Sequence, residues 1–179
     1  DADDLADLRQ GQVLDVQEHG DLALALGELR EGAAELSTSA APLVDALIDR
    51  RWHIGQAVQV ALTVLPPEPA LDLLRRLQAK GFLHPGVVVD AVASMAQCAA
   101  GRSVQNLATM ERALGAEPSG ALRRIGLSLL CELAAKGGWT PEVRRRLETY
   151  RGDRDQWVSD TADLVRVPSE VADGYETGE

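Results

Sequence analysis

Four stretches of the chain place apolar or small residues at the same relative positions, and this repeat constrains the fold more than any other feature. Within each stretch these residues stand at offsets 0, +3, +4, +6 and +7. The stretches begin at Val58, Val89, Leu122 and Val158, so successive first residues are 31, 33 and 36 positions apart. Offsets of three and four bring side chains to one face of an α-helix. A period of about 30–40 residues is typical of solenoids made of helix pairs.

The composition favours helices over strands. Hydrophobic residues make up 45% of the 179 residues, but only six residues are aromatic. The core must therefore consist mainly of leucine, valine and alanine. Small and unbranched residues favour helix, whereas strands are enriched in aromatic and β-branched residues. We expect an all-α solenoid of about four to five antiparallel helix pairs, each too apolar on one face to fold alone.

Prolines, glycines and capping residues divide the chain into short helices. Residues suited to helix starts include Pro85, Ser103, Thr140, Pro141 and either Asp153 or Asp155. The predicted helices are residues 21–36, 42–51, 54–65, 69–80, 86–100, 104–114, 121–136, 141–151 and 156–166. The breaks between them are short, so consecutive helices are expected to be antiparallel neighbours.

The last predicted helix pair resembles a HEAT repeat. Residues 147–165 read LETYRGDRDQWVSDTADLV. Asp153 stands where the family has a turn aspartate, and Val158 and Ala162 match the apolar positions of the second helix. Ser159 stands where the family has an arginine. The resemblance implies a right-handed solenoid in which aspartates and arginines of neighbouring repeats form ladders.

The preceding pair, residues 107–130, shares part of this pattern. It supplies Leu122-Arg123 in the Val-Arg place of the family, but Glu117-Pro118 in place of the turn aspartate. The resemblance to HEAT repeats covers about residues 42–166. The expected organisation is an acidic segment at 1–20, a HEAT-like repeat domain at 21–166 and an acidic, flexible tail at 167–179.

Charge is distributed unevenly along the chain. The net charge is −10 overall, but it is −10 for residues 1–49, +6 for 50–151 and −6 for 152–179. The acidic ends either bind another subunit or shield the basic centre. The chain begins without a methionine, and we expect it to be a piece of a longer polypeptide or a trimmed form of one.

The sequence shows no recognisable catalytic or cofactor motif. It contains neither GxxxxGK nor GxGxxG, and no histidine has a metal-binding partner three or four residues away. Asp153-Arg154-Asp155 begins like a calcium loop, but Val158 replaces the turn glycine and Leu164 the bidentate glutamate. Cys98 and Cys131 occupy equivalent repeat positions, which leaves a disulfide open. The preferred prediction is two small buried thiols in a reducing cytoplasm. We expect no enzymatic activity, no cofactor and no metal.

Arginines provide the candidate binding residues. The chain has 16 arginines and only 2 lysines, and most arginines occur in clusters. A repeated basic stripe could bind phosphates or an acidic partner, whereas the alternative is solvated helix faces with arginines near helix C-termini. The candidate partner-binding residues are Arg50, Arg51, Arg75, Arg76, Arg123, Arg124, Arg144 and Arg145.

These features favour a non-enzymatic protein–protein interaction or scaffold module of a larger protein or assembly. The expected partner is another protein or another domain of the same polypeptide. The expected location is the bacterial cytoplasm, because the sequence has no long apolar run and no signal segment. The first alternative is a nucleic-acid-binding HEAT-like solenoid that uses the arginine-rich face. A small all-α enzyme is the second.

Overall fold

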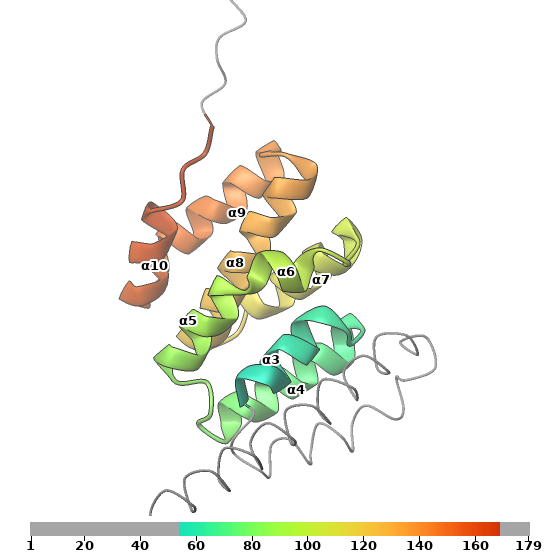
Figure 1. The fold of residues 1–179 in the computed structure, drawn as a ribbon. Coiled ribbons are helices and arrows are strands. Elements are labelled where there is room, and N and C mark those ends of the chain that lie inside the picture. Colours follow the sequence, from blue (N-terminus) through green and yellow to red (C-terminus); the bar gives the residue numbers. More distant parts are fainter. Residues whose placement is uncertain (1–53, 169–179) are drawn as a thin grey trace, which may run out of the picture.

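A computed structural model of the chain describes residues 54–168 (Figure 1). The regular structure in this range is helical: α3 (Ile54–Thr63), α4 (Pro67–Ala79), α5 (Pro85–Ala93), α6 (Met95–Ala99), α7 (Val104–Gly115), α8 (Gly120–Gly137), α9 (Pro141–Arg151) and α10 (Gln156–Asp163). The predicted all-α class is confirmed for this part of the chain. The acidic segment, the two helices predicted before residue 54 and nearly all of the predicted tail lie outside the described residues.

The helices begin and end close to the predicted positions because local chemistry fixes their ends. The side chains of Ser103, Thr140 and Asp155 each accept a hydrogen bond from a backbone N–H in the first turn of α7, α9 and α10. Of the two aspartates predicted as alternatives, Asp155 is therefore the cap. Gly81 follows α4 with a φ of 74°, a conformation that favours glycine.

One predicted helix is wrong. Residues 86–100 were expected to form a single helix, but the chain bends at Ser94 and forms α5 and α6. The Ser94 hydroxyl donates to the carbonyl oxygens of Asp90 and Ala91, both at 3.1 Å. Serine side chains compete in this way for backbone groups and often bend helices. The bend allows both α5 and α6 to contact α3 and α8.

The buried face of the second repeat stretch also differs from the prediction. The repeat spacing placed Val89 at the first apolar position, but Val89 is 53% exposed and Val88 is fully buried. The buried face thus begins one residue earlier than the spacing suggested. In the first and third stretches the first residues, Val58 and Leu122, are buried as expected.

Helix α8 lies at the centre of the described fold (Figure 1). It contacts α4, α5, α6, α7, α9 and α10, and its most extensive partner is α7. Ile125 and Leu129 belong to a core that extends back to α3, whereas Leu127 and Leu130 belong to a second core shared with α9 and α10. Because α8 contributes to both cores, it links the two halves of the fold.

Candidate interaction groove

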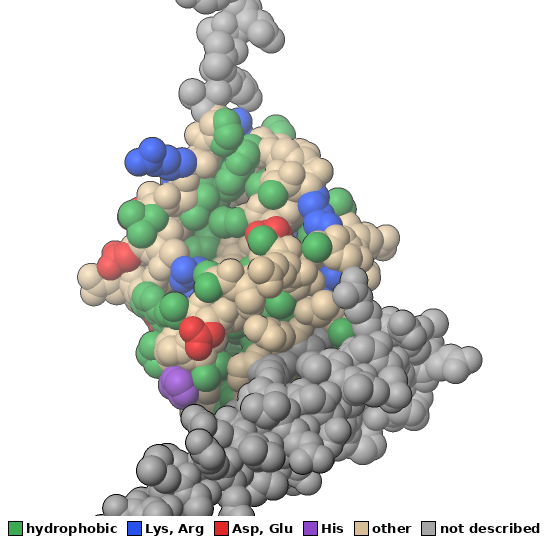
Figure 2. Space-filling view, viewed as in Figure 1, with side chains coloured by type: hydrophobic (Ala, Val, Ile, Leu, Met, Phe, Trp, Pro, Cys, Tyr) green, Lys and Arg blue, Asp and Glu red, His purple; other side chains and the backbone are tan. Residues whose placement is uncertain are grey.

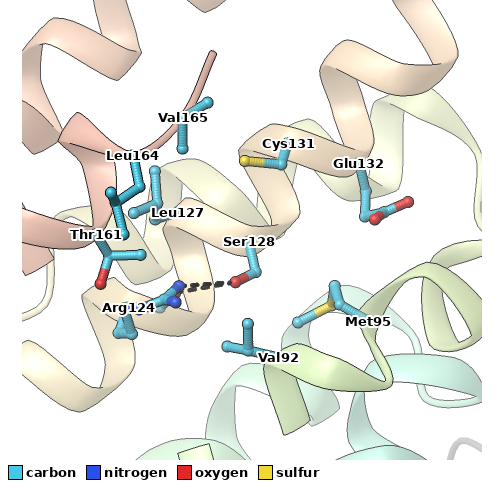
Figure 3. A pocket seen from close by; sticks show the side chains of 10 residues that line it. All are labelled: Val92, Met95, Arg124, Leu127, Ser128, Cys131, Glu132, Thr161, Leu164 and Val165. Atoms are coloured by element: carbon cyan, nitrogen blue, oxygen red, sulfur yellow. Dashed lines mark hydrogen bonds between the residues drawn. The ribbon is translucent and has the colours of Figure 1, made fainter. Parts of the chain in front are cut away.

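A groove crosses the surface where α5, α6, α8 and α10 meet, and its volume is about 250 Å³ (Figure 3). Helix α8 forms its floor, the α5–α6 segment forms one wall, and α10 with the residues after it forms the other. The groove is lined by Val92, Met95, Arg124, Leu127, Ser128, Cys131, Glu132, Thr161, Leu164 and Val165.

The groove is apolar along its walls and polar along its floor. Leu164 stands at its rim and is 79% exposed, so most of its apolar surface is available to a partner. Pockets for small molecules usually measure about 300–1,000 Å³. At about 250 Å³, the groove is better suited to one or two side chains of another polypeptide than to a whole ligand of that class.

Arg124 is the charged group on the floor of the groove. Its Nη1 donates to the Ser128 hydroxyl at 3.1 Å (Figure 3). Its Nε is buried without a hydrogen-bond partner among the described residues. Burial lowers the pKa of the Arg124 guanidinium, because the charged form has lost part of its hydration. Within residues 54–168 no carboxylate forms an ion pair with Arg124.

The two cysteines are free thiols and form no disulfide, but the prediction that both are buried is confirmed only for Cys98. Cys98 is buried, and Cys131 lies partly exposed on the groove floor. Burial raises the pKa of the Cys131 thiol, although the neighbouring Arg124 charge opposes this. Since the thiolate is the nucleophile, this environment does not activate Cys131.

Arg123, the neighbour of Arg124, lies inside the fold. Its Nε and Nη2 donate to the two carboxylate oxygens of Asp153 at 2.7 and 2.8 Å. Its Nη1 donates to the carbonyl oxygens of Glu117 and Pro118. Burial alone would raise the pKa of Asp153, but the hydrogen bonds from Arg123 lower it. Arg123 is therefore engaged by the protein itself and does not extend the exposed surface.

Three other candidate arginines are exposed and paired with carboxylates of the chain. Arg75 contacts Glu117 at 2.6 Å, and Arg76 contacts Asp72 at 2.8 Å. Arg145 pairs with Glu142, one turn earlier on α9. Exposed pairs of this kind contribute little to stability, but they reduce the positive charge that these surfaces offer to a partner.

Arg144 is partly buried, and its Nε donates to the Trp139 carbonyl oxygen at 2.9 Å. Arg50 and Arg51 lie outside the described residues. In the view of Figure 2, basic side chains are separated from one another, whereas apolar side chains are widespread. On the face seen in this view, the basic side chains therefore form no continuous stripe.

Two cations that the sequence analysis missed cap helices from a distance. Arg102 donates to the carbonyl oxygens of Ala61, Leu62 and Leu65 at the end of α3. Lys136, near the end of α8, donates to the carbonyl oxygens of Ala100 and Arg102 just after α6. Each cation thus satisfies carbonyl groups at or just after the C-terminal end of an earlier helix. Separations of 34–41 residues leave no local sequence signal for these bonds.

A second missed cluster joins α7 to α9. The Glu111 side chain is only 1% exposed, and its Oε1 accepts hydrogen bonds from Arg146 at 2.7 and 2.9 Å and from the Tyr150 hydroxyl at 2.9 Å. A Cβ added at Gly126 would lie 2.7 Å from that hydroxyl oxygen. The absence of a side chain at this position on α8 therefore allows Tyr150 to reach Glu111.

Among residues 54–168, no group of three or more His, Cys, Asp or Glu side chains is arranged to hold a metal ion. None of the described helices is both long and apolar enough to cross a membrane. Comparisons with known protein families, with curated proteins and with solved structures find no significant match to this chain.

Proposed function

We propose that the chain is a non-enzymatic protein–protein interaction module and that the groove on α5, α6, α8 and α10 binds a segment of its partner. The partner is another protein or another domain of the same polypeptide. The observation that carries the proposal is the groove itself, in which the exposed Leu164 and the partly exposed Val92 and Val165 lie near a cation that has no carboxylate partner in the described structure. Interfaces between proteins combine apolar contacts with polar groups in this way.

We also propose that the fold is a right-handed HEAT-like solenoid. The bidentate pair between Arg123 on α8 and Asp153 after α9 supports this proposal, because it joins the two units that carry the HEAT-like pattern. The succession of helix contacts also supports it: α3 contacts α5 and α6, these contact α8, and α8 contacts α10. An experimental structure in which successive helix pairs do not superimpose by a constant rotation would contradict the proposal.

The size of the groove indicates how a partner would bind. A pocket of about 250 Å³ receives one or two apolar side chains, which is the usual arrangement when a short segment docks in a groove. Leu164 at the rim then becomes buried against the partner. Burying an exposed leucine is worth about 1.5–3 kcal/mol, so its removal weakens binding by about tenfold or more.

A peptide-display selection against the full chain tests the proposed function. Random short peptides are selected, and their binding is mapped by backbone amide chemical shifts. We expect selected peptides to perturb the groove residues and to bind Leu164→Asp at least about tenfold more weakly. Val104→Asp is the matched control, because Val104 is 48% exposed but does not line the groove. A selection that returns no groove-binding peptide, or peptides that bind Leu164→Asp unchanged, would refute the proposal.

The structure offers less support for a nucleic-acid-binding surface. In that alternative, nucleic acid binds an arginine-rich face of the solenoid. Arg123 is buried, and Arg75, Arg76 and Arg145 have carboxylate partners. Phosphate binding would have to compete with each of these ion pairs. We therefore prefer the protein-binding groove.

A further inference from the structure

We infer that the groove recognises a peptide segment in which a carboxylate, directed at Arg124, accompanies an apolar side chain. This inference rests on the proposed function, because it names the partner chemistry of the same site. Three features carry it: the electrostatics of Arg124, the apolar walls beside it, and the position of Glu132 on the same floor.

The first feature is that the Arg124 guanidinium forms no ion pair with a carboxylate among the described residues. Helix α8 carries two consecutive arginines that point to different surroundings. Arg123 is balanced by the two oxygens of Asp153, whereas Arg124 has only the Ser128 hydroxyl as a side-chain acceptor among the described residues. A partly desolvated guanidinium gains most from a carboxylate, which accepts two parallel hydrogen bonds.

The second feature is the apolar surface within reach of that cation. Figure 3 shows Val92 and Met95 on one side of the Arg124 guanidinium, and Thr161, Leu164 and Val165 on the other. A free anion such as phosphate would leave the exposed Leu164 and the partly exposed Val92 and Val165 in water. An acidic residue next to an apolar residue in a peptide covers both parts of the groove at once.

The third feature, the position of Glu132, sets the direction in which a bound peptide segment lies in the groove. Glu132 lines the groove eight residues after Arg124 on α8, which corresponds to about 12 Å along a helix axis. No described residue forms an ion pair with Glu132. A carboxylate near Glu132 would be repelled, whereas a basic group would be attracted. The segment therefore lies with its acidic end at Arg124 and a neutral or basic end at Glu132.

Charge-swap selections on the full chain test this inference. The same random peptide library is selected against the wild-type chain, Arg124→Glu and Arg145→Glu. The last variant is the matched control, because it makes the same charge change at an exposed site outside the groove. We expect acidic residues beside an apolar residue to be enriched by the wild type and by Arg145→Glu. We expect Arg124→Glu to lose that enrichment and to select basic residues instead.

Direct binding completes the test. A selected peptide should bind Arg124→Glu and Arg124→Gln at least about tenfold more weakly than wild type, with Arg145→Glu within about twofold of wild type. A peptide with its acidic residue changed to lysine should recover binding to Arg124→Glu. Thermal unfolding tests whether each variant is folded. If Arg124→Glu does not fold, Arg124→Gln supplies the comparison with the wild type.

The outcomes separate this inference from the proposed function. If peptides bind the groove without acidic enrichment, or bind Arg124→Gln as tightly as wild type, the carboxylate inference is overturned and the interaction groove stands. If no selected peptide perturbs the groove residues, the proposed function fails, and the inference fails with it.

Discussion

Replacing Arg102 by methionine tests whether long-range helix capping holds the described fold together. The Arg102 side chain is buried, with 7% of the residue exposed. Methionine keeps most of the aliphatic stem of arginine, so packing changes little. What is lost is the set of guanidinium hydrogen bonds to three carbonyl oxygens at the end of α3, including those to Ala61 at 2.7 Å and Leu65 at 2.6 Å. The change therefore isolates the capping interaction.

The magnitude follows from those bonds. A hydrogen bond to a charged group contributes about 1.5–3 kcal/mol. Burying the charged guanidinium also costs desolvation free energy, and the methionine variant no longer bears this cost. Burial lowers the pKa of Arg102, which shows that this cost is present. We expect a net loss of about 2–4 kcal/mol in the free energy of unfolding. For a chain of this size that corresponds to a fall in Tm of about 4–16 °C.

Urea and thermal unfolding followed by circular dichroism measure the effect. Arg145→Met is the matched control, because the Arg145 side chain is 73% exposed, and it should cost less than about 1 kcal/mol. A loss below about 1 kcal/mol for Arg102→Met, or equal losses for the two variants, would show that the α3 carbonyls are satisfied equally well without Arg102.

Three further predictions follow from other contacts. Gly126→Ala should destabilise the chain by about 1–3 kcal/mol, because the added Cβ would lie 2.7 Å from the Tyr150 hydroxyl oxygen. Gly137→Ala is the control, because a Cβ added there meets nothing within 4 Å. Urea unfolding should show this second change to be near neutral. The lowered pKa of Asp153 stabilises the fold at neutral pH, and this stability is lost as the pH falls below the ordinary carboxyl range and through that lowered pKa. Asp153→Asn should flatten this part of the stability–pH curve. Gel-shift assays at about 50 mM salt should show no retardation of DNA or RNA, and clear retardation would revive the nucleic-acid alternative.

Helix positions could be predicted from the sequence because their signals are local. Ser103 and Thr140 cap the helices that follow them, within three residues in the chain. The bend at Ser94 was missed because the same serine can remain within a straight helix or bond back to its own turn. Only the packing of α5 and α6 against α3 and α8 distinguishes the two cases.

The site was less predictable because it depends on contacts across the chain. Arg123 and Arg124 are adjacent, and nothing in their local sequence distinguishes them as candidate binding residues. Their difference arises from Asp153, thirty residues later, which pairs with one of them. The HEAT resemblance drew attention to both members of that pair but did not remove Arg123 from the candidate surface. The groove walls, such as Met95 and Leu164, come from separate helices, and no single stretch of sequence reveals that they meet.

The distant helix caps have a consequence for how the chain is made. Arg102 follows Leu62 by 40 residues, so a ribosome completes α3 well before the residue that caps it emerges. Lys136 stands in the same relation to the segment after α6. Each of these two helix ends is therefore stabilised only when a later part of the chain has been synthesised. A polypeptide stalled just short of Arg102 would expose the uncapped end of α3 to proteases and chaperones.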